Sequence, residues 1–258
     1  MYKDEYSPYK MVWHLLNGEK EKNEYPIFVQ IDLTNICNLS CFYCSSREQK
    51  LYDPKDKLKF DDIVKSLTFL KNKGLKVVEI TGGGEPTLWH DGEKDIIDVL
   101  SLLASLGIRY GMVSNGTHMD TIFQNRQVFE NMDWIRISVD AITPETYEKI
   151  KGRKHFDTVM DNIKQLVYID SGLTIGVSFI VNSENVAEMP LFAKRMKEIG
   201  VHNIRFAPVL QKKYRAKMDF FEQVKEFEDS SCKIFTFSNR EKEFDRYKRI
   251  YNICHYTN

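Results

Sequence analysis

The order of apolar patterns along the chain limits its fold more than any other feature. Six short apolar, β-rich runs occur in order, and each but the last is followed by a stretch with helical spacing of apolar side chains. Such alternation predicts parallel strands joined by right-handed helical crossovers. Six repeats are fewer than the eight of a closed (β/α)8 barrel. We therefore predict an α/β fold with an open (β/α)6 partial TIM barrel.

Periodicity and turn residues give the expected positions of these elements. We expect strands over residues 27–33, 76–81, 108–114, 134–139, 173–181 and 204–209. We expect helices over residues 60–73, 95–106, 121–132, 156–168 and 184–199. Gly74, Gly107 and Gly200 end three of these helices, while Thr143 and Pro144 supply the N-cap and first residue of another.

Changes of pattern divide the chain into three regions. Residues 25–210 form the predicted barrel core, and residues 1–24 are expected to be an N-terminal extension with one short helix. Residues 211–258 are expected to be a C-terminal α/β appendage. Its expected elements are a helix over 217–227, a short strand over 233–237 and a charged helix over 240–253.

Charge and hydropathy exclude several classes of protein. The chain has 37 basic and 37 acidic residues, so its charge gives no broad attraction to nucleic acid or to an anionic membrane surface. No apolar run reaches the length of a transmembrane helix, and no apolar signal segment follows the first residues. We therefore expect a cytoplasmic protein that neither crosses a membrane nor binds nucleic acid.

Three cysteines lie close together on one predicted loop. Cys37, Cys41 and Cys44 have the spacing C-x3-C-x2-C, which indicates a metal site or catalysis rather than a disulfide framework. Three thiolates fit three irons of a cubane iron–sulfur cluster, which normally takes four cysteines. The fourth iron then stays open to a substrate or cofactor, as the metal does in catalytic sites.

Other polar and glycine-rich segments also follow predicted strands. They are residues 81–86 (TGGGEP), 114–117 (SNGT) and 181–183 (VNS), together with Ser138 and Asp140. In parallel α/β folds, ligands bind beyond the carboxyl ends of the strands, which meet at one edge of the sheet. Loops are generally polar, but the coincidence with the cysteine loop predicts one shared site.

These motifs together resemble the radical S-adenosylmethionine (radical SAM) superfamily. The resemblance rests on the cysteine loop, the Gly83-Gly84-Glu85-Pro86 run and the Ser114-Asn115-Gly116 run, and it covers about residues 28–209. It implies an enzyme with two cofactors, a [4Fe–4S] cluster and S-adenosylmethionine. In this family the reduced cluster cleaves S-adenosylmethionine to methionine and a 5′-deoxyadenosyl radical, which takes a hydrogen atom from a substrate. The resemblance leaves two classes of substrate, a peptide and a small molecule.

The resemblance also implies which residues bind S-adenosylmethionine. They are Tyr43, Gly83, Gly84, Glu85, Ser114, Asn115, Ser138, Asp140, Arg153, Val181 and Asn182. The glycines allow close backbone approach to its methionine part, and Glu85 or the backbone beside it accepts the ammonium group. Tyr43 matches an aromatic residue beside the adenine, although an ordinary packing role is equally open. The Ser-Asn pair after the third strand lines the site.

Positions further along the chain carry weaker matches. Ser138 and Asp140 resemble a polar pair that reaches the methionine carboxylate or the ribose, but an Asp at a strand end is often a turn or cap residue. Arg153 matches a basic residue that pairs with the carboxylate, but a basic run is more often a solvated face. Val181 and Asn182 resemble a segment that contacts adenine.

Other interpretations stay open at this point. A zinc-stabilised α/β binding module without radical chemistry needs a fourth ligand near the cysteine loop, such as His90 or His118. A metal-free phosphate-binding enzyme would use the glycine loop, although no Gly-Lys-Ser/Thr follows it. If Arg205 points into the barrel, this charge needs a partner, which is a substrate, a cofactor or a structural carboxylate.

Two features concern partners and extensions of the core. Cys254 stands where a C-terminal SPASM or twitch extension with auxiliary clusters begins in some family members, but Cys232 and Cys254 alone cannot hold such a cluster. They belong to a shortened extension or are ordinary thiols. The resemblance implies a flavodoxin-like or ferredoxin-like electron donor that docks near the cluster, and charged residues 45–56 are the candidate surface.

Overall fold

The described part of the chain is built on one curved, open parallel sheet. The structure is a computed structural model, and it describes residues 25–48, 53–169, 172–216 and 220–236. The strands are β1 (Phe28–Asp32), β2 (Val77–Thr81), β5 (Arg109–Ser114), β6 (Met132–Ser138), β7 (Thr174–Val181), β8 (Asn203–Pro208) and β9 (Lys233–Thr236). They pair in the order β1-β2-β5-β6-β7-β8-β9, and every pair is parallel. The predicted α/β fold with an open partial barrel is therefore confirmed.

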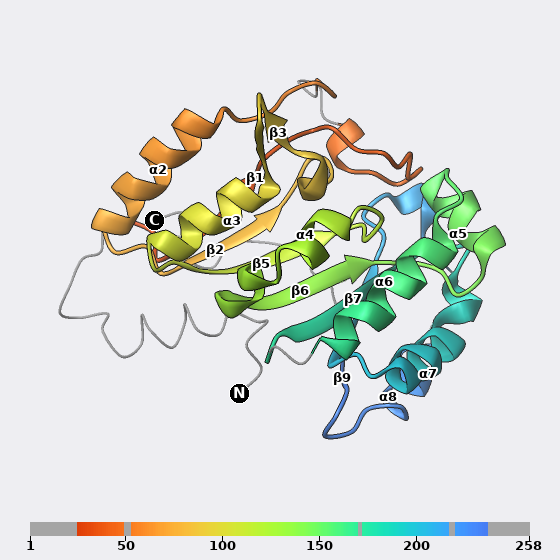
Figure 1. Cartoon of the computed structure of the whole chain (residues 1–258). Helices are drawn as coiled ribbons and strands as arrows, with labels where there is room; N and C mark the ends of the chain where they lie inside the picture. The colour runs from red at the N-terminus through yellow and green to blue at the C-terminus, as the bar shows by residue number, and fades with distance from the viewer. Residues whose placement is uncertain (1–24, 49–52, 170–171, 217–219, 237–258) are drawn as a thin grey trace, which may run out of the picture.

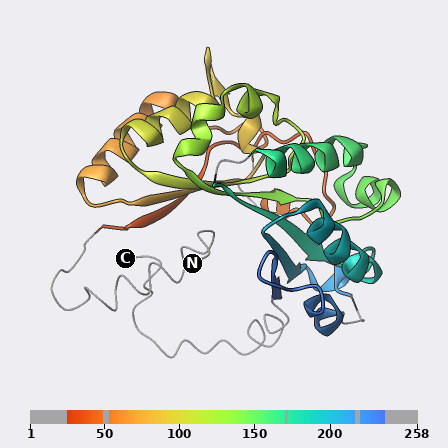
Figure 2. The ribbon, with the colours of Figure 1, turned by 60° about the horizontal axis from the view of Figure 1, so that its bottom comes forward.

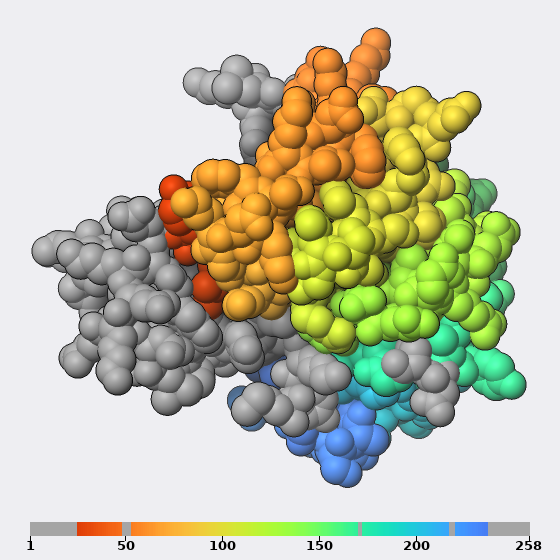
Figure 3. All heavy atoms as spheres, turned by 60° about the vertical axis from the view of Figure 1, so that its left-hand side comes forward, coloured from red at the N-terminus to blue at the C-terminus, as the bar shows by residue number. Residues whose placement is uncertain are grey.

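The helices cover the convex face of this sheet (Figure 1, Figure 2). They are α2 (Phe60–Asn72), α3 (Ile96–Ser105), α4 (Asp120–Gln124), α5 (Pro144–Lys151), α6 (Phe156–Tyr168), α7 (Met189–Ile199) and α8 (Phe221–Lys225). Figure 3 shows α2 and α3 packed side by side on the outer surface. A short antiparallel hairpin of β3 (His90–Asp91) and β4 (Lys94–Asp95) precedes α3. None of the helices in the described ranges is long and apolar enough to cross a bilayer.

Most predicted elements match the structure within two residues, and local chemistry explains why. Thr143 caps α5, because its Oγ1 accepts a hydrogen bond from the Thr146 N–H at 3.2 Å. Gly152 and Gly200 end α5 and α7 in the left-handed conformation, with φ of 70° and 98°. The short helix expected within residues 1–24 and the helix expected over 240–253 lie outside the described residues.

The single helix expected over 121–132 is wrong, because the segment divides at Asn125. The Asn125 side chain donates to the Thr121 carbonyl at 2.8 Å, which caps the short α4, and η3 (Arg126–Glu130) follows as a 3-10 turn. The helix expected over 184–199 also begins later. It starts as η4 (Val186–Glu188), and the regular α7 begins beside Pro190, which suits a first turn.

The short strand expected in the C-terminal appendage belongs to the core sheet. β9 pairs with β8 in parallel and adds a seventh strand to the described sheet. Val224 of α8, Cys232 and Ile234 are buried in the hydrophobic core that the preceding elements form. The α8 helix itself is shorter than the helix expected over 217–227, of which residues 217–219 lie outside the described part.

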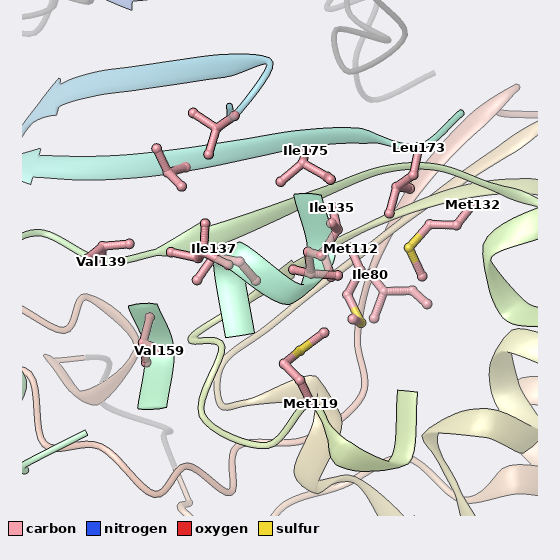
Figure 4. Packing of buried hydrophobic residues seen from close by; sticks show 14 of the residues in the cluster. Ile80, Met112, Met119, Met132, Ile135, Ile137, Val139, Val159, Leu173 and Ile175 are labelled. Atoms are coloured by element: carbon pink, nitrogen blue, oxygen red, sulfur yellow. The ribbon is translucent and has the colours of Figure 1, made fainter. Parts of the chain in front are cut away.

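The core lies between the sheet and its helices. Figure 4 shows Ile135, Ile137 and Val139, from β6 and the residue after it, among this apolar packing, with Val159 of α6 nearby. Because side chains alternate along a strand, the intervening residues of β6 point to the concave face. The concave face is therefore free to carry polar side chains.

Candidate active site

One cavity of about 460 Å³ opens at the carboxyl ends of the strands and extends into the concave face of the sheet. Eleven of the fourteen predicted site residues line it. These are Cys37, Cys41, Tyr43, Cys44, Gly83, Gly84, Glu85, Ser114, Asn115, Ser138 and Asp140. The expectation that strand-end motifs gather at one place therefore agrees with the geometry of the fold.

The cysteine loop is held by the carboxyl end of α5. The N–H groups of Ser40 and Phe42 donate to the carbonyls of Lys151 and Ile150, at 2.8 and 3.3 Å. Within the loop, the Leu39 N–H lies 3.5 Å from the Cys37 sulfur. Cys37, Cys41 and Cys44 are half-buried free thiols, and burial raises the pKa of both Cys37 and Cys41.

The glycine run packs directly against the cysteine loop. The N–H groups of Gly84 and Glu85 donate to the carbonyls of Thr34 and Ile36, both at 2.8 Å. A Cβ at Gly84 would overlap the Ile36 carbonyl and lie 2.6 Å from the Asn35 carbonyl carbon. Glycine is required there so that two backbones can approach each other. The glycine run therefore holds its own turn against the cysteine loop, independently of any role in binding a ligand.

The Glu85 carboxylate accepts four hydrogen bonds from the protein itself. Its Oε1 accepts hydrogen bonds from the Ser114 hydroxyl at 2.7 Å and from the Thr87 N–H and hydroxyl at 3.2 and 2.8 Å. Its Oε2 accepts from the Asn115 N–H at 2.6 Å. Burial raises the pKa of this carboxyl, while these four donors lower it. Glu85 therefore connects the turns after β2 and β5. The two predicted acceptors of the methionine ammonium group were the Glu85 carboxylate and the backbone beside it, and of these the backbone remains accessible.

Asp140 is the centre of a buried ionic network. It has a positive φ of 65°, which a non-glycine residue adopts rarely, and its side chain is 0% exposed. Its Oδ2 lies 2.5 Å from the Lys151 Nζ and also accepts a hydrogen bond from the Tyr43 hydroxyl. Its Oδ1 accepts from the Ile180 N–H at 2.6 Å. Asp140 thus ties together β6, β7, α5 and the cysteine loop.

Lys151 is a site residue that sequence reasoning missed. Its side chain is only 3% exposed and lines the cavity. Burial disfavours its charge, but Asp140 and Tyr43 raise the pKa of Lys151 well above its usual value. The available signal was helical spacing: Lys151 follows the buried Tyr147 by four residues and shares its face of α5.

Amide and hydroxyl side chains complete the rim. The Asn115 Nδ2 donates to the Asn38 Oδ1 at 2.8 Å and lies 4.0 Å from the Cys37 sulfur. Ser138 and Ser178, on neighbouring strands, place their hydroxyl oxygens 3.2 Å apart at the cavity wall. Ser178 was not among the predicted residues, although strand alternation puts it on the same face as Ile180 of β7.

Three predicted cofactor-binding residues do not line the cavity. Arg153 is exposed, and its Nη1 donates to the Gly152 carbonyl at 3.0 Å. Val181 is buried in the hydrophobic core. Asn182 is fully buried, where its Oδ1 accepts from the Glu184 N–H at 2.9 Å and shapes the turn after β7. The basic run therefore places Arg153 on the surface, and the end of β7 places Val181 in the core and Asn182 in a turn.

The fold and the site define a class of protein: an α/β partial barrel with three free cysteines and a glycine-rich turn around one cavity. The Radical SAM superfamily model matches residues 31–196, so the chain belongs to this superfamily of enzymes. Its cofactors are a [4Fe–4S] cluster and S-adenosylmethionine.

Relatives of known sequence cover most of this chain. A probable GTP 3′,8-cyclase of Saccharolobus islandicus (strain M.14.25 / Kamchatka #1) is 33% identical over 178 residues, which are 68% of this chain and 54% of that protein. A probable GTP 3′,8-cyclase of Pyrococcus abyssi (strain GE5 / Orsay) is 26% identical over 225 residues, 86% of this chain and 71% of that protein. The chain therefore spans about half the length of the Saccharolobus relative.

Solved structures share the fold. Streptococcus suis SuiB bound to S-adenosylmethionine has a TM-score of 0.66 at 16% identity, covering 92% of this chain and 57% of that chain. The structure of native anSMEcpe with bound AdoMet has a TM-score of 0.59 at 18% identity, covering 85% of this chain and 62% of that chain. At these identities the likeness concerns the fold alone.

The residues of this cavity fit an iron–sulfur cluster better than a zinc ion. All three cysteines are free and line one cavity, with a side-chain amide and a backbone N–H near Cys37. His90 and His118, the proposed fourth zinc ligands, are exposed and do not line the cavity. In the described ranges, no three His, Cys, Asp or Glu side chains are placed to hold a single ion. Cluster cysteines each bind a different iron, so they stand further apart than ligands of one zinc.

Proposed function

We propose that this chain uses a [4Fe–4S] cluster held by Cys37, Cys41 and Cys44 to cleave S-adenosylmethionine and to start radical chemistry on a small molecule. The observation that carries the proposal is the convergence of three free, half-buried cysteines on one cavity of the partial barrel. When bound, the two cofactors supply a 5′-deoxyadenosyl radical, which takes a hydrogen atom from the substrate.

The protein's own residues bind and orient the cofactor in this proposal. The backbone at Gly82 and Gly83 offers carbonyl groups at the rim for the methionine ammonium, since the Glu85 carboxylate is already bound by four donors. The paired hydroxyls of Ser138 and Ser178 suit the ribose or the carboxylate, because a hydroxyl both donates and accepts.

The buried network keeps the cysteine loop in place. Asp140 and Lys151 fix the Tyr43 hydroxyl, while the carbonyl of Lys151 accepts a hydrogen bond from the backbone of that loop. The Gln211 Nε2, after β8, donates to the Tyr43 carbonyl at 2.8 Å and also holds the loop. These are positioning residues, because they act on a cofactor through the loop.

A small molecule is favoured as the substrate over a peptide. The relatives that cover two thirds or more of this chain are named for GTP cyclisation, and GTP is a small molecule. SuiB, whose structure was solved with a bound precursor peptide, is similar at only 13% identity, which supports the fold and no substrate.

The electron donor is proposed to be flavodoxin-like or ferredoxin-like and to dock beside the cysteine loop. Ser45 and Arg47 are exposed there, and Arg47 donates to the Leu39 carbonyl at 2.5 Å. A surface with exposed charge close to the cluster suits a transient redox partner. Residues 49–52 of the proposed 45–56 surface lie outside the described part.

The test is anaerobic reconstitution of the full chain with iron and sulfide, followed by dithionite and S-adenosylmethionine. We expect 5′-deoxyadenosine and methionine as products. Cys41→Ala should abolish both, because it removes one of three cluster ligands. Cys232→Ala is the matched control, since Cys232 is buried near β9 and outside the cavity, and it should cleave the cofactor as the wild type does. Cleavage by the Cys41→Ala protein would contradict the proposal.

A further inference from the structure

Three polar side chains form a closed ring of hydrogen bonds beside Cys37. The Thr117 hydroxyl donates to the Asn115 Oδ1 at 2.6 Å, and the Asn115 Nδ2 donates to the Asn38 Oδ1 at 2.8 Å. The Asn38 Nδ2 donates back to the Thr117 hydroxyl oxygen at 2.8 Å. Asn38 follows Cys37 directly, whereas Asn115 and Thr117 belong to the turn after β5. The ring therefore ties the cysteine loop to that turn.

The ring and the backbone leave one orientation for the Asn115 amide. The Thr117 N–H points at one end of this amide, at 2.9 Å, and a backbone N–H can only donate. The atom at that end is therefore the oxygen, and the amide nitrogen occupies the other end. The Asn115 backbone is fixed as well, since its N–H donates to the Glu85 Oε2 at 2.6 Å, and the residue is 8% exposed.

One N–H of the Asn115 amide is left over for the Cys37 sulfur. An amide nitrogen carries two hydrogens, and the bond to Asn38 uses one of them. The same nitrogen lies 4.0 Å from the Cys37 sulfur, a long hydrogen bond. The Leu39 N–H also approaches this sulfur, at 3.5 Å. Cys37 thus faces two N–H groups, one from its own loop and one from the turn after β5.

N–H groups at a ligand sulfur change how readily an iron–sulfur cluster accepts an electron. A thiolate bound to iron carries negative charge, and reduction of the cluster adds to it. A donor directed at this sulfur stabilises the reduced cluster more than the oxidised one and so raises the reduction potential. The effect is larger for a buried donor, because little water screens it.

We propose that Asn115 is a positioning residue that directs its side-chain N–H at the Cys37 thiolate and raises the reduction potential of the cluster. The assignment rests on the proposed function, because it takes Cys37 to be a ligand of the [4Fe–4S] cluster. Reduction here is the transfer of one electron from a reductant such as dithionite to the oxidised cluster, with no bond broken. Asn115 then acts on the cluster, whereas the sequence resemblance placed it among the residues that bind S-adenosylmethionine.

The first test is a redox titration of the reconstituted full chain without S-adenosylmethionine, followed by electron paramagnetic resonance of the reduced cluster. Asn115→Leu keeps a side chain of similar size but removes the N–H. At the midpoint potential of the wild type, it should lower the ratio of reduced to oxidised cluster at least about threefold. This corresponds to a midpoint more negative by about 28 mV, since a factor of ten is about 59 mV for one electron.

Thr117→Val is the matched control, because it opens the same ring and leaves the donor at the sulfur. The Thr117 backbone N–H still fixes the Asn115 Oδ1, and the Asn115 Nδ2 still reaches Asn38 and Cys37. We expect lower thermal stability and an unchanged midpoint potential. A ring that is purely structural predicts equal shifts in the two variants, or none in either. Either of these results overturns the proposal.

A spectroscopic measurement tests the contact independently of Asn115→Leu. Asparagine labelled with ¹⁵N in its side-chain amide is incorporated, and pulsed electron paramagnetic resonance measures its hyperfine coupling to the reduced cluster. Coupling should appear in the wild type and in Thr117→Val. It should be lost in Asn115→Asp, which keeps the shape of the side chain and leaves the other labelled asparagines, Asn38 among them, in place. No coupling in the wild type, or the same coupling in Asn115→Asp, contradicts the assignment.

Two further assays on the same preparations separate this proposal from the proposed function. They are iron and sulfide content and the cleavage of S-adenosylmethionine. A cluster whose potential and ¹⁵N coupling depend on Asn115, in a chain that cleaves no cofactor, refutes the proposed function alone. A chain that cleaves the cofactor and has the same potential with Asn or Leu at position 115 refutes the role of Asn115 alone. A wild type that binds no iron overturns both.

Discussion

Lys151→Met is expected to lower the free energy of unfolding by about 3–5 kcal/mol, the usual effect of removing one partner of a buried ion pair. The Asp140 carboxylate would remain 0% exposed without the ammonium group that now lies 2.5 Å from it. The Tyr43 hydroxyl and the Ile180 N–H would still donate to Asp140, but neither carries a compensating charge. Denaturant unfolding of the metal-free chain measures the change.

Variants at neighbouring positions make this result specific. Asp140→Asn should destabilise the chain for the same reason, and Asn tolerates the left-handed backbone at this position. The double variant Lys151→Met/Asp140→Asn should cost less than the sum of the single changes, because no unpaired charge remains. Lys149→Met is the control on the same helix: its ammonium pairs with Glu184 but is 63% exposed, so the loss should stay under about 1 kcal/mol. Equal losses at Lys149 and Lys151 would refute the account of this network.

The effect of Lys151→Met should be constant across neutral pH. The pKa of Lys151 is raised in the folded state, so its stabilising contribution is complete below the pKa of an unfolded lysine. That contribution is lost only as the pH rises through the raised folded value. Unfolding experiments at two neutral pH values should therefore give the same difference between variant and wild type.

Gly84→Ala is expected to prevent stable incorporation of the cluster. The added Cβ would overlap the Ile36 carbonyl and crowd the Asn35 backbone, and backbone atoms of a loop cannot rotate away as a side chain can. The turn would then separate from the cysteine loop, and two hydrogen bonds at 2.8 Å would break. Overpacking of this kind costs roughly 1–3 kcal/mol, to which each lost hydrogen bond adds about 1 kcal/mol.

Iron and sulfide analysis after anaerobic reconstitution measures the effect. The wild type should hold about four of each per chain, whereas most Gly84→Ala chains should hold none. Gly82→Ala is the control in the same run, because the three atoms nearest to a Cβ there all belong to Gly84 of its own turn, the closest at 3.1 Å. It should keep most of the cluster. A Gly84→Ala protein with full iron content would show that the close packing of the two loops is dispensable.

Periodicity predicted the fold well because local signals and tertiary packing agree in most of the chain. Helix α6 occupies the expected residues, and Thr143 caps α5 as its residue type predicts. The prediction and the structure differ at Asn125, where the side-chain amide donates a hydrogen bond to a backbone carbonyl of the preceding turn and divides the expected helix. Apolar spacing carries no information on such local competition.

Position at a strand end predicted which residues gather at the cavity for most of the candidate residues but not for all, and the exceptions have a common physical cause. The cysteine loop, the glycine run and Asp140 lie where their strand-end positions predict. In the basic run at the end of α5, however, Lys151 lines the cavity and Arg153 is exposed, and only the face of the helix distinguishes them. Two of the four donors to Glu85, the Ser114 hydroxyl and the Asn115 N–H, come from a loop that is distant in sequence, so apolar spacing and motifs do not reveal them.

A cluster held by three cysteines is expected to leave one iron to bind S-adenosylmethionine. Electron paramagnetic and nuclear double resonance of the reduced cluster tests it most directly, with the cofactor labelled by ¹⁵N in its amino group and ¹⁷O in its carboxylate. The account predicts hyperfine coupling of both labels to the cluster, absent when unlabelled cofactor is used. A cluster signal that shows no coupling to either label, with the cofactor at saturation, would contradict it.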